Sequence, residues 1–154
     1  MKKPITLLFL FVSLVAGNAN AWPWTSLAKR MEGQYSFTHE VGMMNPDSED
    51  GWEIVEAEDT LSIKKISKNK IKFEFELVAT NAHMCGMEGE ATKVGKTFVY
   101  TEKYEWSEND IRTCRLEMSI VENKILLTDS DGNCREMYCG ARAGIDGSTF
   151  SMDQ

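Results

Sequence analysis

The sequence predicts an all-β domain: a small, calycin-like meander barrel of about seven or eight mainly antiparallel strands, preceded by a short helical turn. Three observations lead to this fold class. Apolar and charged residues alternate over 71–79, as in a strand with one buried and one solvated face. Similar stretches recur along the chain and are joined by short turn sequences. No long stretch has the period of an amphipathic helix, and the regular spacing favours a barrel over a sandwich.

The individual elements follow in chain order. Residues 26–31 predict one or two helical turns that end at Gly33, and Tyr35 with Phe37 indicates a first strand. The remaining strands are expected around 52–55, 61–63, 71–79, 98–100, 116–120 and 125–127, with turns at 67–70, 94–96 and 122–123.

Residues 1–21 are predicted to form a cleavable secretory signal peptide. Two lysines precede an apolar run over 5–17, and the Ala-Asn-Ala that ends the segment supplies the small residues that signal peptidase requires, with cleavage before Trp22. The run is short for a membrane-spanning helix, which makes an uncleaved anchor the less favoured alternative. The style of the segment is bacterial, so we expect 22–154 to be a single disulfide-stabilised β domain in the periplasm.

The chain is acidic. Its 17 Lys and Arg against 24 Asp and Glu give a formal net charge of −7. Removal of the signal peptide takes away two lysines and leaves 15 basic residues against 24 acidic ones, a net charge of −9. This excess argues against nucleic acid or an anionic membrane as a partner of the mature protein, and it suits a basic protein partner.

All four cysteines, Cys85, Cys114, Cys134 and Cys139, follow the signal peptide. An even number in an exported chain predicts two disulfides. Zinc binding is disfavoured because there is no C-x-x-C pair and an oxidising compartment disfavours free thiolates. If the 122–123 turn closes a hairpin, Cys114 lies opposite 131–134, which favours Cys114–Cys134 and leaves Cys85 for Cys139. The pairing of Cys85 with Cys114 and of Cys134 with Cys139 stays open as an alternative.

No enzymatic motif occurs in the sequence, so we expect neither an enzyme nor a cofactor. His39 is interpreted as an edge-strand residue, and His83 as the neighbour of a half-cystine, a poor position for a general base. Residues 129–133 resemble part of a calcium loop. Cys134 stands where that loop needs glycine, so an Asp-Gly turn without a metal is expected. An enzyme that uses paired acids is the least favoured alternative.

Two acidic loops that carry a tryptophan, 42–51 with the adjoining Trp52 and 105–110, are the candidate partner-binding sites. An aromatic side chain with charged neighbours has the composition of an interface hot spot, and long loops between strands commonly bind partners. The alternative is a solvated acidic loop whose tryptophan folds back onto the barrel, which is the favoured interpretation for Trp52. The predicted contact residues are Asp47, Glu49 and Asp50 in the first loop and Glu105, Trp106, Glu108 and Asp110 in the second.

The C-terminal half resembles a class of small exported bacterial proteins. The residues that carry the resemblance are Cys114, Cys134, the run Cys139-Gly140-Ala141-Arg142-Ala143, Asp146, Gly147 and Phe150, with Cys85 upstream. This pattern is similar to periplasmic lysozyme inhibitors and to immunity proteins against cell-wall-cutting toxins of the type VI secretion system. The resemblance implies that Gly140 allows a turn beside a disulfide and that Arg142 pairs with an acid. Known inhibitors of c-type lysozyme insert a Ser-Gly-containing loop into the enzyme, and this chain has no matching stretch.

A second, shorter similarity supports the barrel. Gly33-Gln34-Tyr35 follows the predicted helical turn and resembles the G-x-W entry strand of calycin-type barrels, with Tyr in place of Trp.

These observations lead to one main hypothesis: a periplasmic binding protein that inhibits a cationic cell-wall hydrolase, either a lysozyme inhibitor or a toxin immunity protein. Export, the acidic charge of a compact disulfide-bonded domain and the lack of a catalytic set motivate it. The partner would be a basic peptidoglycan hydrolase or a lytic toxin. The alternative is a small apolar ligand-binding barrel of the periplasm, since a barrel of about eight strands can hold one ligand at its mouth.

Overall fold

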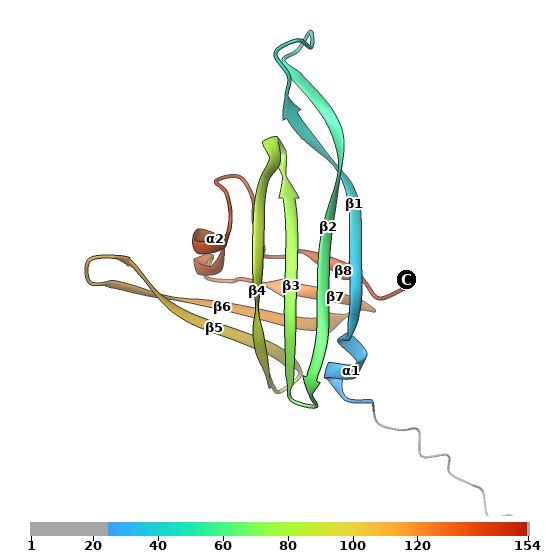
Figure 1. Cartoon of the computed structure of the whole chain (residues 1–154), viewed down its shortest axis with the longest axis vertical. Coiled ribbons are helices and arrows are strands. Elements are labelled where there is room, and N and C mark those ends of the chain that lie inside the picture. Colours follow the sequence, from blue (N-terminus) through green and yellow to red (C-terminus); the bar gives the residue numbers. More distant parts are fainter. Residues whose placement is uncertain (1–24, 154) are drawn as a thin grey trace, which may run out of the picture.

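The computed structural model describes residues 25–153, so the predicted signal peptide lies outside the described part of the chain. Eight antiparallel strands form one sheet in which each strand pairs with the next along the sequence. The first and last strands lie against each other, which brings the sheet close to a closed barrel (Figure 1). The predicted all-β meander barrel is confirmed.

The strands are β1 (Gly33–Met44), β2 (Trp52–Ser67), β3 (Lys70–Ala79), β4 (His83–Val94), β5 (Thr97–Ser107), β6 (Asp110–Val121), β7 (Lys124–Thr128) and β8 (Thr149–Ser151). Three short helical segments accompany them: α1 (Leu27–Met31), the 3-10 turn η1 (Thr80–Ala82) and α2 (Asn133–Tyr138).

Most of the predicted turns are present, and the strands are longer than expected. At the β6–β7 turn, Glu122 and Asn123 both have positive φ, as a two-residue hairpin of type I′ requires. The stretches around 52–55 and 61–63 belong to a single strand, β2. The stretch 105–110 is mostly strand and turns at 108–109, whereas 45–51 of the loop expected over 42–51 does connect two strands. Both connections lie at the ends of long hairpins.

The interior of the barrel is filled by apolar side chains from alternate strand positions. The largest fully buried ones are Phe73, Phe75, Phe98, Phe150, Met31, Leu61, Ile71, Leu116, Met118, Ile125, Leu127 and Ile145. Helix α1 closes one end: Ala28 and Met31 are fully buried, and the Tyr35 hydroxyl donates a hydrogen bond of 3.0 Å to the Met31 carbonyl. Burial of this kind is the main stabilising contribution to a small β domain.

The sheet splits between β4 and β5. These strands pair only where 92–94 meets 97–99, and beyond that point they diverge (Figure 1). The segment formed by α2 and 139–140 bridges the split: Cys139 forms an isolated β-bridge with Cys85 of β4, and the Gly140 amide donates to the Met84 carbonyl at 2.8 Å.

Both disulfides fix this bridging segment. Cys85–Cys139 joins it to β4, and Cys114–Cys134 joins it to β6. The pairing favoured from the hairpin geometry is confirmed. Two disulfides indicate that the protein folds in an oxidising compartment, as an exported protein does. In the described part of the chain, no helix has the length and apolar character needed to cross a membrane.

Two hairpins extend beyond the barrel wall in different directions (Figure 1). Strand β2 pairs with β3 only from Thr60 onward, so residues 38–58 form a two-stranded ribbon, the β1–β2 arm. Residues 103–113 form the β5–β6 arm. These arms carry the two predicted binding loops at their tips.

Candidate functional site

The structure divides the predicted contact residues between two separate tips. Asp47, Glu49 and Asp50 lie in the turn of the β1–β2 arm, whereas Glu105, Trp106, Glu108 and Asp110 lie at the tip of the β5–β6 arm. Because the two arms point in different directions (Figure 1), the seven residues form two candidate sites and not one continuous site.

At the tip of the β1–β2 arm, Asp50 shapes the turn. Its carboxylate accepts the Trp52 amide at 3.1 Å and the Ser48 hydroxyl at 3.2 Å, and these hydrogen bonds, the Trp52 amide first, lower the pKa of Asp50. The Trp52 ring lies across Gly42 on the paired strand, 3.5 Å from where a Cβ would stand. Trp52 thus packs onto its own arm. Asp47, Glu49 and Asp50 are all exposed in this turn, and of the three Asp50 is the one that accepts hydrogen bonds within it.

At the tip of the β5–β6 arm, Trp106 is held in place and still half exposed, at 50%. The Arg112 guanidinium lies 4.8 Å from the centre of its ring, and the Tyr104 ring meets it edge-on at 6.5 Å. Arg112 in turn pairs with Asp110 at 3.0 Å and with Glu136 of α2, and these two carboxylates raise the pKa of Arg112. Asp110 therefore positions Arg112.

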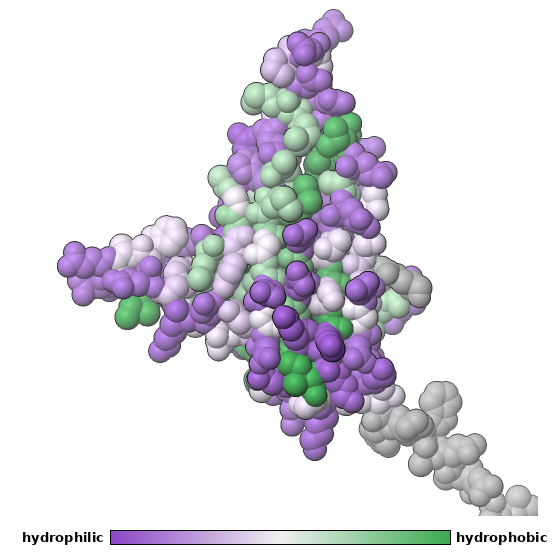
Figure 2. Space-filling model, viewed as in Figure 1, coloured by the Kyte–Doolittle hydropathy of each residue, from purple (hydrophilic) through white to green (hydrophobic). Residues whose placement is uncertain are grey.

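The outer acids of this arm have a different environment. Glu105 and Glu108 are exposed at the tip, beside the half-exposed Trp106. Ile111, which pairs with Glu105 on the face of the arm opposite Trp106, is 71% exposed. In Figure 2 a hydrophobic group stands out close to this tip on an otherwise hydrophilic arm. The tip thus combines exposed apolar side chains with carboxylates, a composition typical of binding surfaces.

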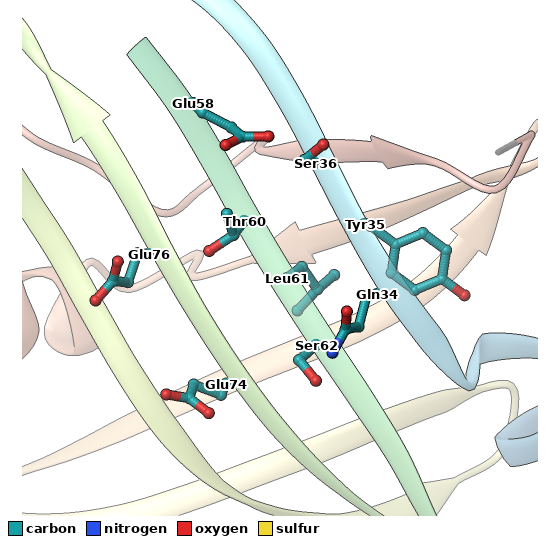
Figure 3. A pocket seen from close by; sticks show the side chains of 9 residues that line it. All are labelled: Gln34, Tyr35, Ser36, Glu58, Thr60, Leu61, Ser62, Glu74 and Glu76. Atoms are coloured by element: carbon teal, nitrogen blue, oxygen red, sulfur yellow. The ribbon is translucent and has the colours of Figure 1, made fainter.

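A groove on the outer face of β1, β2 and β3 is a site that the sequence reasoning missed. It has a volume of about 630 Å³. Figure 3 shows Glu58, Glu74 and Glu76 rising from β2 and β3 on the same side of the sheet, while Tyr35 points away from them. The groove is lined by Gln34, Tyr35, Ser36, Glu58, Thr60, Leu61, Ser62, Glu74 and Glu76.

Few basic side chains neutralise the acids of this face. Glu74 lies directly opposite Glu88 of β4, and Glu40 opposite Glu56, although like charges at such positions destabilise a sheet. Lys72 approaches Glu88 at 3.4 Å. Within residues 25–153, none of the three groove carboxylates forms an ion pair, so this surface presents concentrated negative charge. The alternation over 71–79 places Glu74 and Glu76 outside, but only the strand register brings Glu58 to them.

A cluster of Tyr100, Glu102 and Tyr138 occupies the split between β4 and β5. Both tyrosine hydroxyls donate to the same carboxylate oxygen of Glu102, Tyr100 at 2.6 Å. These two bonds lower the pKa of Glu102, whereas burial and the Glu102 contact raise the pKa of both tyrosines. In the sequence, Glu102 continues the alternation of the inward-facing Phe98 and Tyr100, and this spacing could have identified it as an acid that faces inward.

This cluster predicts a pH-dependent stability. The lowered pKa of Glu102 means that its contribution is present above about pH 4.5 and is lost as the pH falls through the folded-state value. The raised pKa of each tyrosine means that a contribution present below about pH 10 is lost at higher pH. At pH 7, Glu102→Gln should lower the free energy of unfolding by about 1.5 kcal/mol.

Urea unfolding of the wild type and of Glu102→Gln at several pH values checks this prediction. The difference between the two proteins should shrink as the pH falls from about 5 to about 3. Glu108→Gln, which changes the same charge on the exposed arm, is the control and should follow the wild type. A difference that stays constant across the acid range would contradict the role given to Glu102.

His39 and the C-terminal segment, both considered in the sequence analysis, are part of the structural framework. His39 Nε2 lies 3.1 Å from the Asp59 carboxylate, which also accepts the Val78 amide at 2.7 Å. This pair holds the β1–β2 arm to β3 where the arm leaves the barrel wall. The C-terminal segment is tied by Arg135, whose guanidinium donates to the Ala141 and Ala143 carbonyls, each at 2.8 Å. The resemblance had assigned an anchoring role to Arg142, which is exposed.

The 129–133 stretch caps a helix. Asp129 is 3% exposed, and its carboxylate accepts the amides of Cys134 at 3.2 Å and Arg135 at 2.8 Å. Such contacts satisfy amides at the start of α2. In residues 25–153, no group of three or more His, Cys, Asp or Glu is arranged to hold a metal ion.

The fold and these surfaces define the protein as a two-disulfide antiparallel β-barrel that carries an acidic sheet face and an aromatic, acidic arm. Comparisons of the chain with protein-family models, with curated proteins and with solved structures gave no match.

Proposed function

We propose that this protein is a periplasmic inhibitor of a cationic cell-wall hydrolase, acting as a lysozyme inhibitor or as a toxin immunity protein. The observation that carries the proposal is Trp106, half exposed at the end of an arm and held there by Arg112 and Tyr104. An aromatic side chain that is already ordered loses little conformational entropy on binding, which favours it as an interface anchor.

The charge around this anchor fits a basic partner. Glu105 and Glu108 flank Trp106, and the protein as a whole is strongly acidic. Opposite charge accelerates association and selects among partners. The groove acids Glu58, Glu74 and Glu76 offer a second surface for lysine and arginine side chains of the same partner. Because large apolar side chains fill the barrel interior, we assign the binding function to the outer surface.

Replacing Trp106 by alanine is expected to weaken binding to the target hydrolase by about 30-fold or more, the effect of losing a hot-spot side chain. The measurement is calorimetric titration against basic peptidoglycan hydrolases, including any lytic enzyme encoded beside the gene, together with inhibition of cell-wall digestion.

Trp52→Ala is the matched control for this experiment. Trp52 is also a partly exposed tryptophan on an arm, but its ring lies on Gly42, so its loss should change the affinity by less than about threefold. Thermal unfolding of both variants shows whether they are folded. The proposal fails if the wild-type protein neither binds nor slows any such hydrolase, and the choice of arm fails if Trp52→Ala has the larger effect.

A further inference from the structure

The end of the barrel opposite the tip of the β1–β2 arm, here called the base, consists of α1, the β2–β3 turn and the β4–β5 turn (Figure 1). These three parts are neighbours. The Lys93 amide donates to the Asn69 carbonyl at 2.9 Å, which joins the two turns. Leu27 and Arg30 of α1 line the same groove as Lys93 and Lys96. The base is therefore one continuous surface built from separate parts of the sequence.

This surface has the opposite charge to the rest of the protein. Of the acids near it, two are already paired with lysine: Glu32 with Lys29 at 2.6 Å, and Glu90 with Lys70. Glu122, two residues beyond the groove-lining Ile120, is exposed at the margin of this surface. Two aliphatic side chains stand out among the cations, Ile66 at 49% exposure and Val94 at 57%. The exposed cations of the base are Lys29, Arg30, Lys65, Lys68, Lys93 and Lys96.

A groove of about 550 Å³ opens on the base between α1 and the β4–β5 turn. Arg30, Lys93 and Lys96 supply three positive charges, and Leu27 and Ile120 supply apolar contacts. Three cations around a partly apolar groove can accept a phosphate while contacting hydrocarbon.

We propose that the base docks on the surface of a bilayer that contains anionic phospholipid. Lysines and arginines near an anionic membrane surface attract it, and exposed aliphatic side chains between them enter the interfacial region. Ile66 and Val94 are the inserting side chains, and the groove of Arg30, Lys93 and Lys96 receives a lipid phosphate.

Docking of the base on a bilayer would leave the β5–β6 arm free to bind a hydrolase. Membrane binding is therefore a function additional to the proposed inhibition. The net charge of the chain predicted no anionic membrane partner, but it averages over two ends of opposite sign. Strand β1 alone spans about 36 Å from the base toward the arm tip. Screening acts over about 10 Å at 0.1 M salt, so acids at the far end weaken the contact of the base only slightly.

The test is co-sedimentation of the exported chain with vesicles of equal parts phosphatidylglycerol and phosphatidylcholine, and with vesicles of phosphatidylcholine alone. We expect binding to the anionic vesicles only, reversed in about 0.5 M salt. Lys93→Ala with Lys96→Ala should weaken vesicle binding about 25-fold, since each lysine at such a surface contributes about fivefold. Adding Val94→Ser to this double variant should weaken vesicle binding further. It should leave the salt dependence of binding unchanged, because valine carries no charge.

Lys103→Ala with Arg142→Ala is the matched control, because it removes the same charge from exposed positions outside the base and should leave vesicle binding unchanged. Equal losses in the two double variants, or no binding of the wild type to anionic vesicles, would overturn the proposal. So would tight binding of inorganic phosphate or single-stranded DNA in the absence of vesicle binding. Hydrolase inhibition in solution should be the same for the Lys93/Lys96 variant and the wild type, which separates this test from that of the proposed function.

Discussion

Replacing Cys85 and Cys139 together by alanine is expected to lower the free energy of unfolding by about 4 kcal/mol. The bridge spans 54 residues of sequence, and closing a longer loop removes more entropy from the unfolded chain. The Cys114–Cys134 bridge spans 20 residues and should contribute about 3 kcal/mol by the same reasoning. Each bridge is thus a sizeable fraction of the stability of a domain of this size.

The position of the longer bridge adds a structural reason. Cys139 follows Tyr138, whose hydroxyl contacts Glu102 inside the split between β4 and β5. Without the bridge, the segment that covers this split is held to β4 by the Gly140 amide and its neighbours alone. We therefore expect the tyrosine near-ultraviolet signal to change in Cys85→Ala/Cys139→Ala even under conditions where the barrel is folded.

Denaturant unfolding without reductant measures both effects. Cys114→Ala/Cys134→Ala is the comparison, since it removes the other bridge from the same segment. A loss below about 1 kcal/mol for the Cys85/Cys139 variant would contradict a stapling role for this bridge.

The fold class could be predicted because its signals are local. Alternation over 71–79 and turn sequences such as 122–123 fix strands and their sequence neighbours, and a meander pairs neighbours only. The same locality favoured Cys114–Cys134, because the β6–β7 hairpin returns the chain toward Cys114, although Cys134 itself lies beyond β7 in α2. A helix of six residues such as α2 is too short to give a recognisable period, so it was not predicted.

The candidate site was predicted only in part because surfaces depend on register and on where strands part. Trp106 with its flanking acids is one stretch of sequence, and the structure does place it at an exposed tip. No local pattern shows that β2 leaves β3 at Thr60, so the long β1–β2 arm that carries the 42–51 loop was not predicted. The acidic groove needs three strands in register, and the ion pair of Arg112 with Glu136 joins residues 24 positions apart.

Asp129→Ala is expected to lower the free energy of unfolding by about 3 kcal/mol. The Asp129 side chain is buried, and its carboxylate accepts two amides of α2, from Cys134 and Arg135. Hydrogen bonds to an ionised group are stronger than neutral ones, and the substitution leaves the buried Cys134 amide and the partly buried Arg135 amide without their acceptor. The Asp129 amide also donates to the Asp146 carboxylate at 2.9 Å, and because it is a backbone contact it remains in Asp129→Ala.

Asp131→Ala is the matched control, because Asp131 lies in the same turn but is exposed. It removes the same charge and should change the free energy of unfolding by less than about 0.5 kcal/mol. Asp129→Asn keeps one acceptor without the charge and should fall between the two. Urea unfolding gives all three values, and hydrogen exchange of the Cys134 and Arg135 amides reports directly on the cap. If Asp129→Ala and Asp131→Ala are equally stable, the carboxylate does not hold α2, and the disulfides and the Arg135 contacts must position the helix without it.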